Sequence, residues 1–149
     1  MADYTTNGLM CAQPFEYSKL VEQLKQNGLR PTRQRVVLAK ILFGQGARHV
    51  TAEQLHHEVR QSHLRISLAT VYNTLNQFAA AGMLREIMGQ GSQTYFDTRT
   101  DDHYHFALPN NRGLIDFPAD GISFSALPQL PDGTQIDKIE VTIHLKKSA

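Results

Sequence analysis

The hydrophobic pattern of this 149-residue chain changes its period at Gly82, and this change constrains the fold more than any other feature. Before Gly82 the apolar residues recur at helical spacing, and beyond it they alternate as in β-strands. Apolar residues at helical spacing form one face on a helix but not on a strand, and alternating apolar residues form one face on a strand but not on a helix. The sequence therefore predicts an α+β protein whose helices come first.

The helical half contains start and stop signals for four helices. They are expected at 17–27, from Pro31 to Gly44, at 51–61 and at 67–81. Thr51 and Gln54 have the spacing of a capping box, and Ser67 is a suitable N-cap. The core-facing residues expected in the second and fourth helices are Val37, Leu38, Ile41, Leu42, Leu68, Val71, Leu75 and Phe78.

The second half contains strand signals separated by turns. Segments 84–87 and 94–97 flank a glycine-rich turn and predict a hairpin, and further strands are expected at 103–108, 113–117 and 136–145. Residues 118–131 are expected to be a loop with at most a short helical turn. Helices followed by a hairpin are the element order of a winged helix-turn-helix domain.

We accordingly expect an N-terminal arm at 1–16, a winged-helix domain at 17–97 and a small sheet-rich domain at 98–149. The last part is too short to bury a large core alone, which favours pairing with a second copy of the chain.

Charge is distributed unevenly along the chain, although the net charge is only +1. Residues 17–48 contain seven cationic residues and one anionic residue, whereas residues 98–149 contain five cationic and seven anionic ones. Such asymmetry is typical of a half that binds a polyanion. The alternative is a solvated basic surface with no partner.

The fourth predicted helix has an uncharged polar face that suits the major groove of double-stranded DNA. Amide side chains on this face can pair with adenine, and the basic run upstream can contact phosphates. The expected DNA-binding residues are Arg33, Arg35, Ser67, Ala69, Thr70, Tyr72, Asn73 and Asn76.

A second group of residues has the chemistry of metal ligands. His103 and His105 are two apart in a predicted strand and therefore share a face. Imidazoles combined with nearby carboxylates suit zinc, iron(II) or manganese(II). The alternative is that both histidines simply face solvent.

Other classes of protein are disfavoured. The lone Cys11 excludes an intrachain disulfide framework and a Cys-x-x-Cys zinc site. No apolar run is long enough for a membrane span, and the N-terminus lacks a secretory signal pattern, so we expect a cytoplasmic protein. No constellation of catalytic residues stands out, so an enzyme is not expected.

Four segments resemble the ferric uptake regulator (Fur) family of bacterial repressors: LRPTRQR at 29–35, HVTAE at 49–53, SLATVYNTLNQF at 67–78 and YFD at 95–97. Segments 46–50 and 114–117 and the missing cysteines are most similar to the iron response regulator (Irr) subgroup. The resemblance implies a homodimeric two-domain repressor of iron homeostasis genes in which Tyr72 contacts DNA. Residues 17–97 would then be the winged-helix DNA-binding domain, and residues 98–149 the small α/β dimerisation and ligand-sensing domain.

The resemblance also implies one divalent metal per subunit, bound between the two domains. The residues at the family's ligand positions are His49, Asp97, His103, His105 and Asp116. The other metal sites of the family are incomplete in this chain. Asp102 and Tyr104 stand at the positions of a second metal site, and Leu108 and Asn111 stand where the first cysteine pair of a zinc site would be.

Haem is the alternative ligand that the Irr subgroup suggests, with His103, Tyr104 and His105 as the candidate ligands. The Cys-Pro motif of some members is broken here, because Ala12 follows Cys11. The prediction is thus a DNA-binding regulator that acts on an AT-containing palindromic operator and is controlled by a metal or by haem. A ligand-independent winged-helix protein with passive histidines is the rival interpretation.

Overall fold

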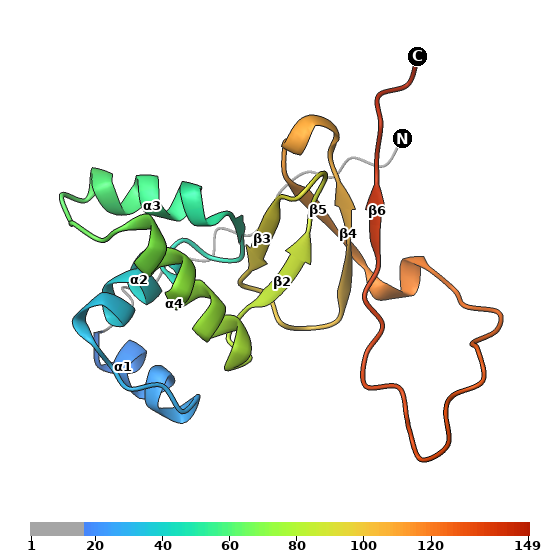
Figure 1. Cartoon of the computed structure of the whole chain (residues 1–149), viewed down its shortest axis with the longest axis horizontal. Helices are drawn as coiled ribbons and strands as arrows, with labels where there is room; N and C mark the ends of the chain where they lie inside the picture. Colours follow the sequence, from blue (N-terminus) through green and yellow to red (C-terminus); the bar gives the residue numbers. More distant parts are fainter. Residues whose placement is uncertain (1–16) are drawn as a thin grey trace.

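The computed structural model describes residues 17–149, which form a group of helices followed by two small sheets (Figure 1). The helices are α1 (Tyr17–Gln26), α2 (Arg33–Phe43), α3 (Ala52–Gln61) and α4 (Leu68–Ala80), and the short 3-10 turns are η1 (Pro109–Asn111) and η2 (Ala119–Gly121). The strands are β1 (His49–Val50), β2 (Arg85–Met88), β3 (Thr94–Asp97), β4 (His103–Ala107), β5 (Leu114–Pro118) and β6 (Thr142–His144). The α+β class is confirmed. The predicted N-terminal arm and Cys11 lie outside the described residues.

Side-chain caps fix where three of the helices begin. Thr32, Thr51 and Ser67 each accept a hydrogen bond from a backbone N–H in the first turn of the helix that follows. At Thr51 the capping box is complete, because the Gln54 N–H donates to Thr51 Oγ1 over 3.1 Å and the Thr51 N–H donates to Gln54 Oε1 over 2.9 Å. These bonds satisfy N–H groups that have no partner within the helix.

The main core lies among the four helices and extends to β3 through Phe96. The core differs from the expected pattern in two respects. In α2, Val36 and Ala39 are also buried, and Val37 and Ile41 are half-buried and pack against the core. The apolar stripe is wide enough for the helix to settle with a slightly different rotation.

Leu68 is the second exception, since 39% of its surface is exposed. It occupies the first turn of α4, beyond the neighbours that cover the rest of the helix. Thr74 is buried instead, and its hydroxyl donates to the Thr70 carbonyl over 2.8 Å. This internal bond satisfies the hydroxyl, so that a polar residue is accommodated in the core.

Each of the two sheets has three strands. The first has the order β1-β3-β2, and all of its pairs are antiparallel. The second has the order β5-β4-β6, with β4 antiparallel to β5 and parallel to β6. Sequence analysis missed β1, because a strand of two residues is too short to show alternation.

The last predicted strand was too long. Strand β6 covers only Thr142–His144, which pairs with His105–Ala107 of β4. Residues 122–141 contain no helix or strand, and Ile136 is exposed. Alternation alone does not form a strand without a neighbouring strand to receive its hydrogen bonds. The loop predicted at 118–131 is confirmed, with η2 as its short helical turn.

The hairpin β2–β3 packs against the second sheet (Figure 1). Ile87 and Tyr95 of the hairpin form a small apolar cluster with Ala107 and Leu114. The Tyr95 hydroxyl donates to the Asn111 carbonyl over 3.1 Å. The core of the C-terminal part is therefore completed by side chains from the hairpin. None of the helices within 17–149 has the length and apolar character that a membrane span requires.

We predict that Thr51→Ala lowers the free energy of unfolding by about 1 kcal/mol, because one bond of the capping box is lost. Urea denaturation of the metal-free protein measures this change. Ser62→Ala, at the exposed end of the same helix, is the control and should change stability by less than about 0.5 kcal/mol. Equal stabilities of the two variants would contradict a role for this cap.

Candidate functional site

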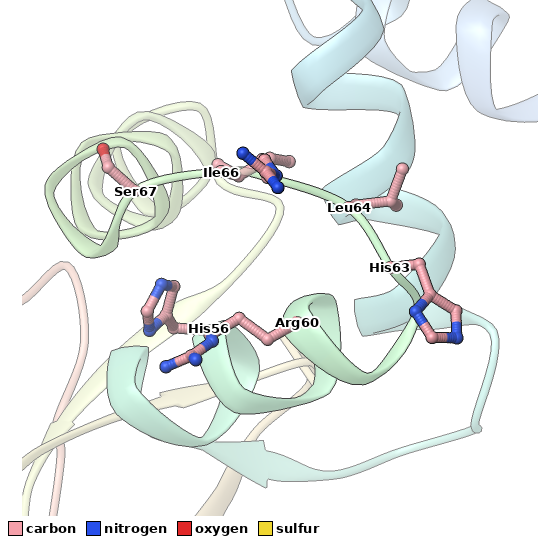
Figure 2. Close-up of a pocket in the computed structure, with 7 residues that line it drawn as sticks. His56, Arg60, His63, Leu64, Ile66 and Ser67 are labelled. Carbon is pink, nitrogen blue, oxygen red and sulfur yellow. The ribbon is translucent and has the colours of Figure 1, made fainter.

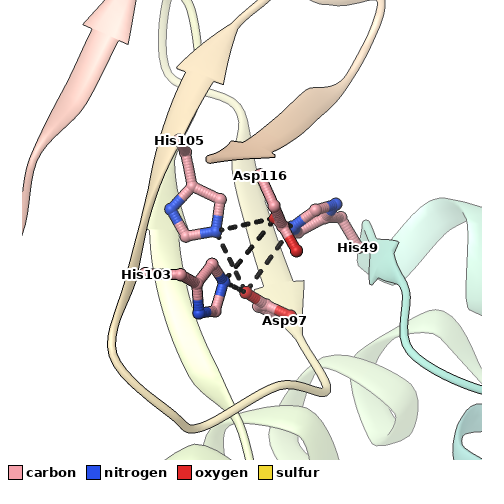
Figure 3. A group of neighbouring side chains, drawn as sticks. All are labelled: His49, Asp97, His103, His105 and Asp116. Atoms are coloured by element: carbon pink, nitrogen blue, oxygen red, sulfur yellow. Dashed lines mark hydrogen bonds and ion pairs between the residues drawn. The ribbon is translucent and has the colours of Figure 1, made fainter. Parts of the chain in front are cut away.

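Five side chains that the sequence singled out meet at one point between the two sheets (Figure 3). One potential ligand atom from each lies within 4.8 Å of all the others. The residues are His49, Asp97, His103, His105 and Asp116.

Strand pairing brings these residues together. His49 of β1 is opposite Asp97 of β3 in the first sheet, and His105 of β4 is opposite Asp116 of β5 in the second. His103 lies two residues before His105 and therefore points to the same side of β4. Since β4 follows β3 after only residues 98–102, the two pairs lie close to each other.

The imidazoles surround a single carboxylate oxygen. The Nε2 atoms of His103 and His105 lie 2.8 and 3.0 Å from Asp97 Oδ2. His49 Nε2 lies 3.5 Å from the same oxygen and 2.7 Å from Asp116 Oδ1. Asp97, His103 and His105 are almost completely buried, whereas the other two side chains are partly accessible.

The hydrogen bonds on the outer side of the cluster determine which way His103 presents its lone pair. Its Nδ1 lies 2.8 Å from the Asp101 carbonyl, which can only accept a hydrogen bond. The proton of the neutral ring is therefore on Nδ1, and Nε2 turns a lone pair toward the Asp97 carboxylate. Two acceptors at this distance repel each other unless a proton or a metal cation lies between them.

Two further atoms of the cluster have no hydrogen-bond partner among the described residues. They are His49 Nε2 and Asp116 Oδ1, which are buried and face each other. Buried polar atoms are rarely left unsatisfied. Their common orientation toward the centre of the cluster fits a cation that both would coordinate.

The protonation equilibria show how strongly the groups interact. Burial alone would raise the pKa of Asp97, but the hydrogen bonds from His105 and the Arg99 N–H, together with the nearby His49 ring, hold that pKa far below its ordinary value. Burial opposes protonation of His49, yet the nearby carboxylates of Asp97 and Asp116 raise the pKa of His49. Asp97 therefore stays ionised and attracts positive charge to this site.

The donor set consists of three imidazole nitrogens and two carboxylate oxygens. This combination suits borderline divalent cations such as zinc, iron(II) and manganese(II). It provides neither thiolates for a cysteine-type zinc site nor the oxygen-rich shell that calcium prefers. The metal chemistry expected from the sequence therefore fits the observed geometry.

The three residues suggested as haem ligands do not share a face. His103 and His105 point toward Asp97, while Tyr104 lies on the opposite side of β4. The ring of Tyr104 contacts that of Phe117, with 5.8 Å between their centroids. Because side chains alternate along a strand, the three residues do not approach a common point, and a joint haem site stays a prediction that this geometry does not support.

Helix α4 presents the polar face that the sequence predicts. Ser67, Ala69, Tyr72, Asn73 and Asn76 are exposed, whereas Thr70 is half-buried and its hydroxyl bonds with that of Ser67 over 2.9 Å. The Tyr72 ring contacts Phe96 edge-on, at a centroid distance of 6.2 Å. This contact fixes the ring while leaving 41% of the residue exposed.

The arginines of the basic run differ in their surroundings. Arg33 is exposed, but the Arg35 guanidinium donates to Gln77 Oε1 over 2.8 and 3.2 Å and to the Arg30 carbonyl over 2.8 Å. Arg48 is paired with Glu58. Arg35 therefore links α2 to α4, and the charge of Arg48 is partly neutralised within the chain.

A basic hollow adjoins the start of α4 (Figure 2). The hollow is lined by His56, Arg60, His63, Leu64, Arg65, Ile66 and Ser67. Sequence analysis did not name Arg60 or Arg65 as DNA contacts. The available signal was the four-residue spacing of His56 and Arg60, which places both on one face of α3.

A groove borders the later turns of α4. Tyr72 and Asn76 lie on one side of it, and Lys138 and Glu140 line it from the segment before β6. The segment before β6 therefore lies beside the polar face of α4.

Helices α2, α3 and α4 followed by the hairpin β2–β3 form a winged helix-turn-helix, the fold of a DNA-binding regulator. The chain belongs to the ferric uptake regulator family, whose model matches residues 26–144. It is therefore a DNA-binding transcription regulator and not an enzyme. Regulators of this family act as dimers.

Relatives and solved structures agree with this assignment. The chain is 33% identical to the peroxide operon regulator of Bacillus subtilis over 72% of this chain and 73% of the relative. It is 32% identical to the peroxide-responsive repressor PerR of Staphylococcus saprophyticus over 65% of each chain.

Two solved structures share the fold. The ferric uptake regulator of Vibrio cholerae has a TM-score of 0.66 at 24% identity and covers 85% of this chain and 98% of its own. The Pseudomonas aeruginosa regulator, solved with manganese, has a TM-score of 0.67 at 23% identity and covers 86% and 97%. Membership of the Irr subgroup stays a prediction.

We predict that ionised Asp97 stabilises the metal-free fold above a pH of about 4 and that this stabilisation is lost as the pH falls, since folding lowers its pKa. In chelator, the free energy of unfolding should decrease more steeply toward acid pH for the wild type than for Asp97→Asn. The exposed Asp132→Asn is the control and should follow the wild type. An equally steep decrease in the Asp97 variant would contradict the interpretation.

Proposed function

We propose that this chain is a metal-responsive transcriptional repressor that binds one divalent metal per subunit between its two sheets. The metal ligands are His49, Asp97, His103, His105 and Asp116. The observation that carries the proposal is their convergence within 4.8 Å, with a lone pair of His103 directed at Asp97 and His49 Nε2 only 2.7 Å from Asp116 Oδ1. When bound, the cation supplies the positive charge that these facing acceptors lack.

Family relatives support the proposed ligand class. Solved structures of the same fold include a Pseudomonas aeruginosa regulator with manganese and a Francisella tularensis regulator with iron. A donor set of imidazoles and carboxylates accommodates either metal. We infer iron(II) or manganese(II) as the metal, with zinc as a competitor, and control of iron homeostasis as the biological role.

The position of the site suggests how metal binding reaches the DNA. His49 and Asp97 belong to the sheet of the winged domain, whereas His103, His105 and Asp116 belong to the second sheet. A ligand bound to both parts stabilises one arrangement of the two domains and shifts the population toward it. Because the groove beside Tyr72 is bounded by residues 138–140, such a change alters access to the recognition helix.

The partner is double-stranded DNA in the cytoplasm, where a bacterial repressor meets its operator. Exposed Asn73 and Asn76 are suited to adenine, which favours an AT-containing site. A homodimer presents two recognition helices related by a two-fold axis, so the operator is a palindrome. The basic hollow beside Ser67 is positioned to contact a phosphate at the start of the recognition helix (Figure 2).

The experiment that tests the proposal measures metal content and operator affinity together, with and without chelator. A repressor of this type binds one metal per subunit and changes its DNA affinity when the metal is removed. A ligand-independent winged-helix protein would bind DNA equally well in both conditions.

A response to peroxide is a second candidate function, and the named relatives favour it. The regulators from Bacillus subtilis and Staphylococcus saprophyticus are both peroxide regulators by name. Treating the metal-loaded protein with hydrogen peroxide before measuring DNA binding separates this role from simple metal sensing. Loss of DNA binding only when metal and peroxide are both present supports the peroxide role.

We predict that His105→Ala abolishes metal binding, because it removes a buried donor at the centre of the cluster. His49→Ala should weaken binding without unfolding the protein, since His49 lies at the more accessible edge of the site. His144→Ala is the control, because His144 is exposed on β6. Metal stoichiometry after dialysis measures all three, and wild-type metal content in the His105 variant would refute the site.

We predict that Tyr72→Ala reduces discrimination between operator and random DNA by about 1–3 kcal/mol while leaving its salt dependence unchanged. Tyr72→Phe keeps the ring contact with Phe96 and separates the loss of the hydroxyl from a loss of packing. Arg60→Ala should instead weaken binding to all sequences and reduce the slope of log K against log salt by about 1. Unchanged discrimination in the Tyr72→Ala variant would show that Tyr72 does not contact bases.

A further inference from the structure

Arg99 lies in the five-residue connection between β3 and β4 and contacts both aspartates of the proposed metal centre. Its backbone N–H donates to Asp97 Oδ1 over 2.8 Å, and its Nη1 donates to Asp116 Oδ2 over 2.9 Å. The opposite side of the guanidinium is held by Asp101, through Nε at 3.1 Å and Nη2 at 2.5 Å.

In each of the two aspartates, one carboxylate oxygen accepts a hydrogen bond from Arg99 and the other faces the histidines. In Asp97 the oxygen bound by Arg99 is Oδ1, and the oxygen that faces the imidazoles is Oδ2. In Asp116 the oxygen bound by Arg99 is Oδ2, and the oxygen that faces His49 is Oδ1. Each carboxylate is thus left with one oxygen for a metal.

We propose that Arg99 is a positioning residue whose guanidinium makes Asp116 bind the metal through a single oxygen, while its backbone N–H leaves Asp97 one oxygen in the same way. The inference rests on the function proposed above, since it concerns the same metal centre. Asp101 completes the unit, because its carboxylate fixes the guanidinium and its carbonyl accepts the hydrogen bond from His103 Nδ1. One short connection therefore orients three of the five donors.

This arrangement limits the coordination number as well as the geometry. With both aspartates restricted to one oxygen, the chain would offer a cation three nitrogens and two oxygens. Without Arg99, the Asp116 carboxylate is free to chelate through both oxygens or to turn toward solvent, because its side chain is 25% exposed. Outer hydrogen bonds of this kind orient metal ligands and tune metal affinity.

The contribution of Arg99 to folding is expected to be small, so that its effect on the metal can be measured separately. The Arg99 and Asp101 side chains are 36% and 62% exposed, and ion pairs at such exposure contribute little to stability. Arg99 also has no place in either of the apolar clusters found among the described residues.

The test is a cobalt(II) titration of the full chain, because the visible absorption of cobalt(II) reports coordination geometry independently of DNA binding. We expect Arg99→Ala to weaken cobalt(II) binding by about 10–100-fold in a chelator competition and to change the absorption spectrum. Arg99→Lys should recover part of the affinity, since one ammonium group can reach Asp116 but cannot hold two carboxylates as a planar fork. Arg112→Ala, an exposed arginine of the same half, is the control and should match the wild type.

Each outcome decides between the two proposals. A wild-type chain that binds no cobalt(II) refutes the metal centre itself. A wild-type chain that binds it, with an Arg99→Ala variant of equal affinity and spectrum, refutes the role of Arg99 alone. If Arg99→Ala does not fold, Asp101→Asn replaces it, because this change keeps the carbonyl but weakens the hold on the guanidinium. Unaltered cobalt(II) affinity and spectrum in Asp101→Asn then overturn the proposal.

Discussion

The meeting of three imidazole nitrogens around one oxygen of Asp97 is the interaction on which the rest of this structure depends. A buried carboxylate is costly unless its charge is compensated, and here the compensation comes from both sheets. The same convergence joins the winged-helix part to the second sheet. Whatever cation or proton occupies this point therefore influences how the two parts of the chain are held.

The supporting structure keeps the donors of this site in place from outside. Strand pairing sets His49 opposite Asp97 and His105 opposite Asp116. Backbone and side-chain donors of Arg99 then hold the outer carboxylate oxygens, which leaves the inner ones directed at the imidazoles. These outer hydrogen bonds orient the carboxylates of the cluster in advance, although His49 and Asp116 are partly accessible to solvent.

In the winged-helix part, some side chains hold the helices in place, and others are exposed on the surface. Arg35 and Gln77 tie α2 to α4, and Phe96 supports the ring of Tyr72. The exposed polar face of α4 and the basic hollow beside Ser67 remain accessible for bases and phosphates. Phe96, which contacts Tyr72 of α4, immediately precedes Asp97 in β3, so the helix and the His/Asp cluster are linked through neighbouring residues of one strand.

The sequence by itself determined the helices, their caps and the hairpin, because local spacing and side-chain chemistry encode these features. Spacing also singled out His103 and His105, whereas the resemblance to the family added His49, Asp97 and Asp116, which converge with them in the structure. The sequence did not determine β1, the short extent of β6 or the burial of Thr74 in place of Leu68, since each depends on neighbours distant in the chain. The position of Tyr104 on the side of β4 opposite His103 and His105 follows from strand alternation. The role of Arg99 was beyond the sequence for the same reason. Only the tertiary structure places the Arg99 guanidinium between Asp101 and Asp116. Asp116 belongs to β5, and no rule of local sequence spacing predicts its contact with the segment before β4.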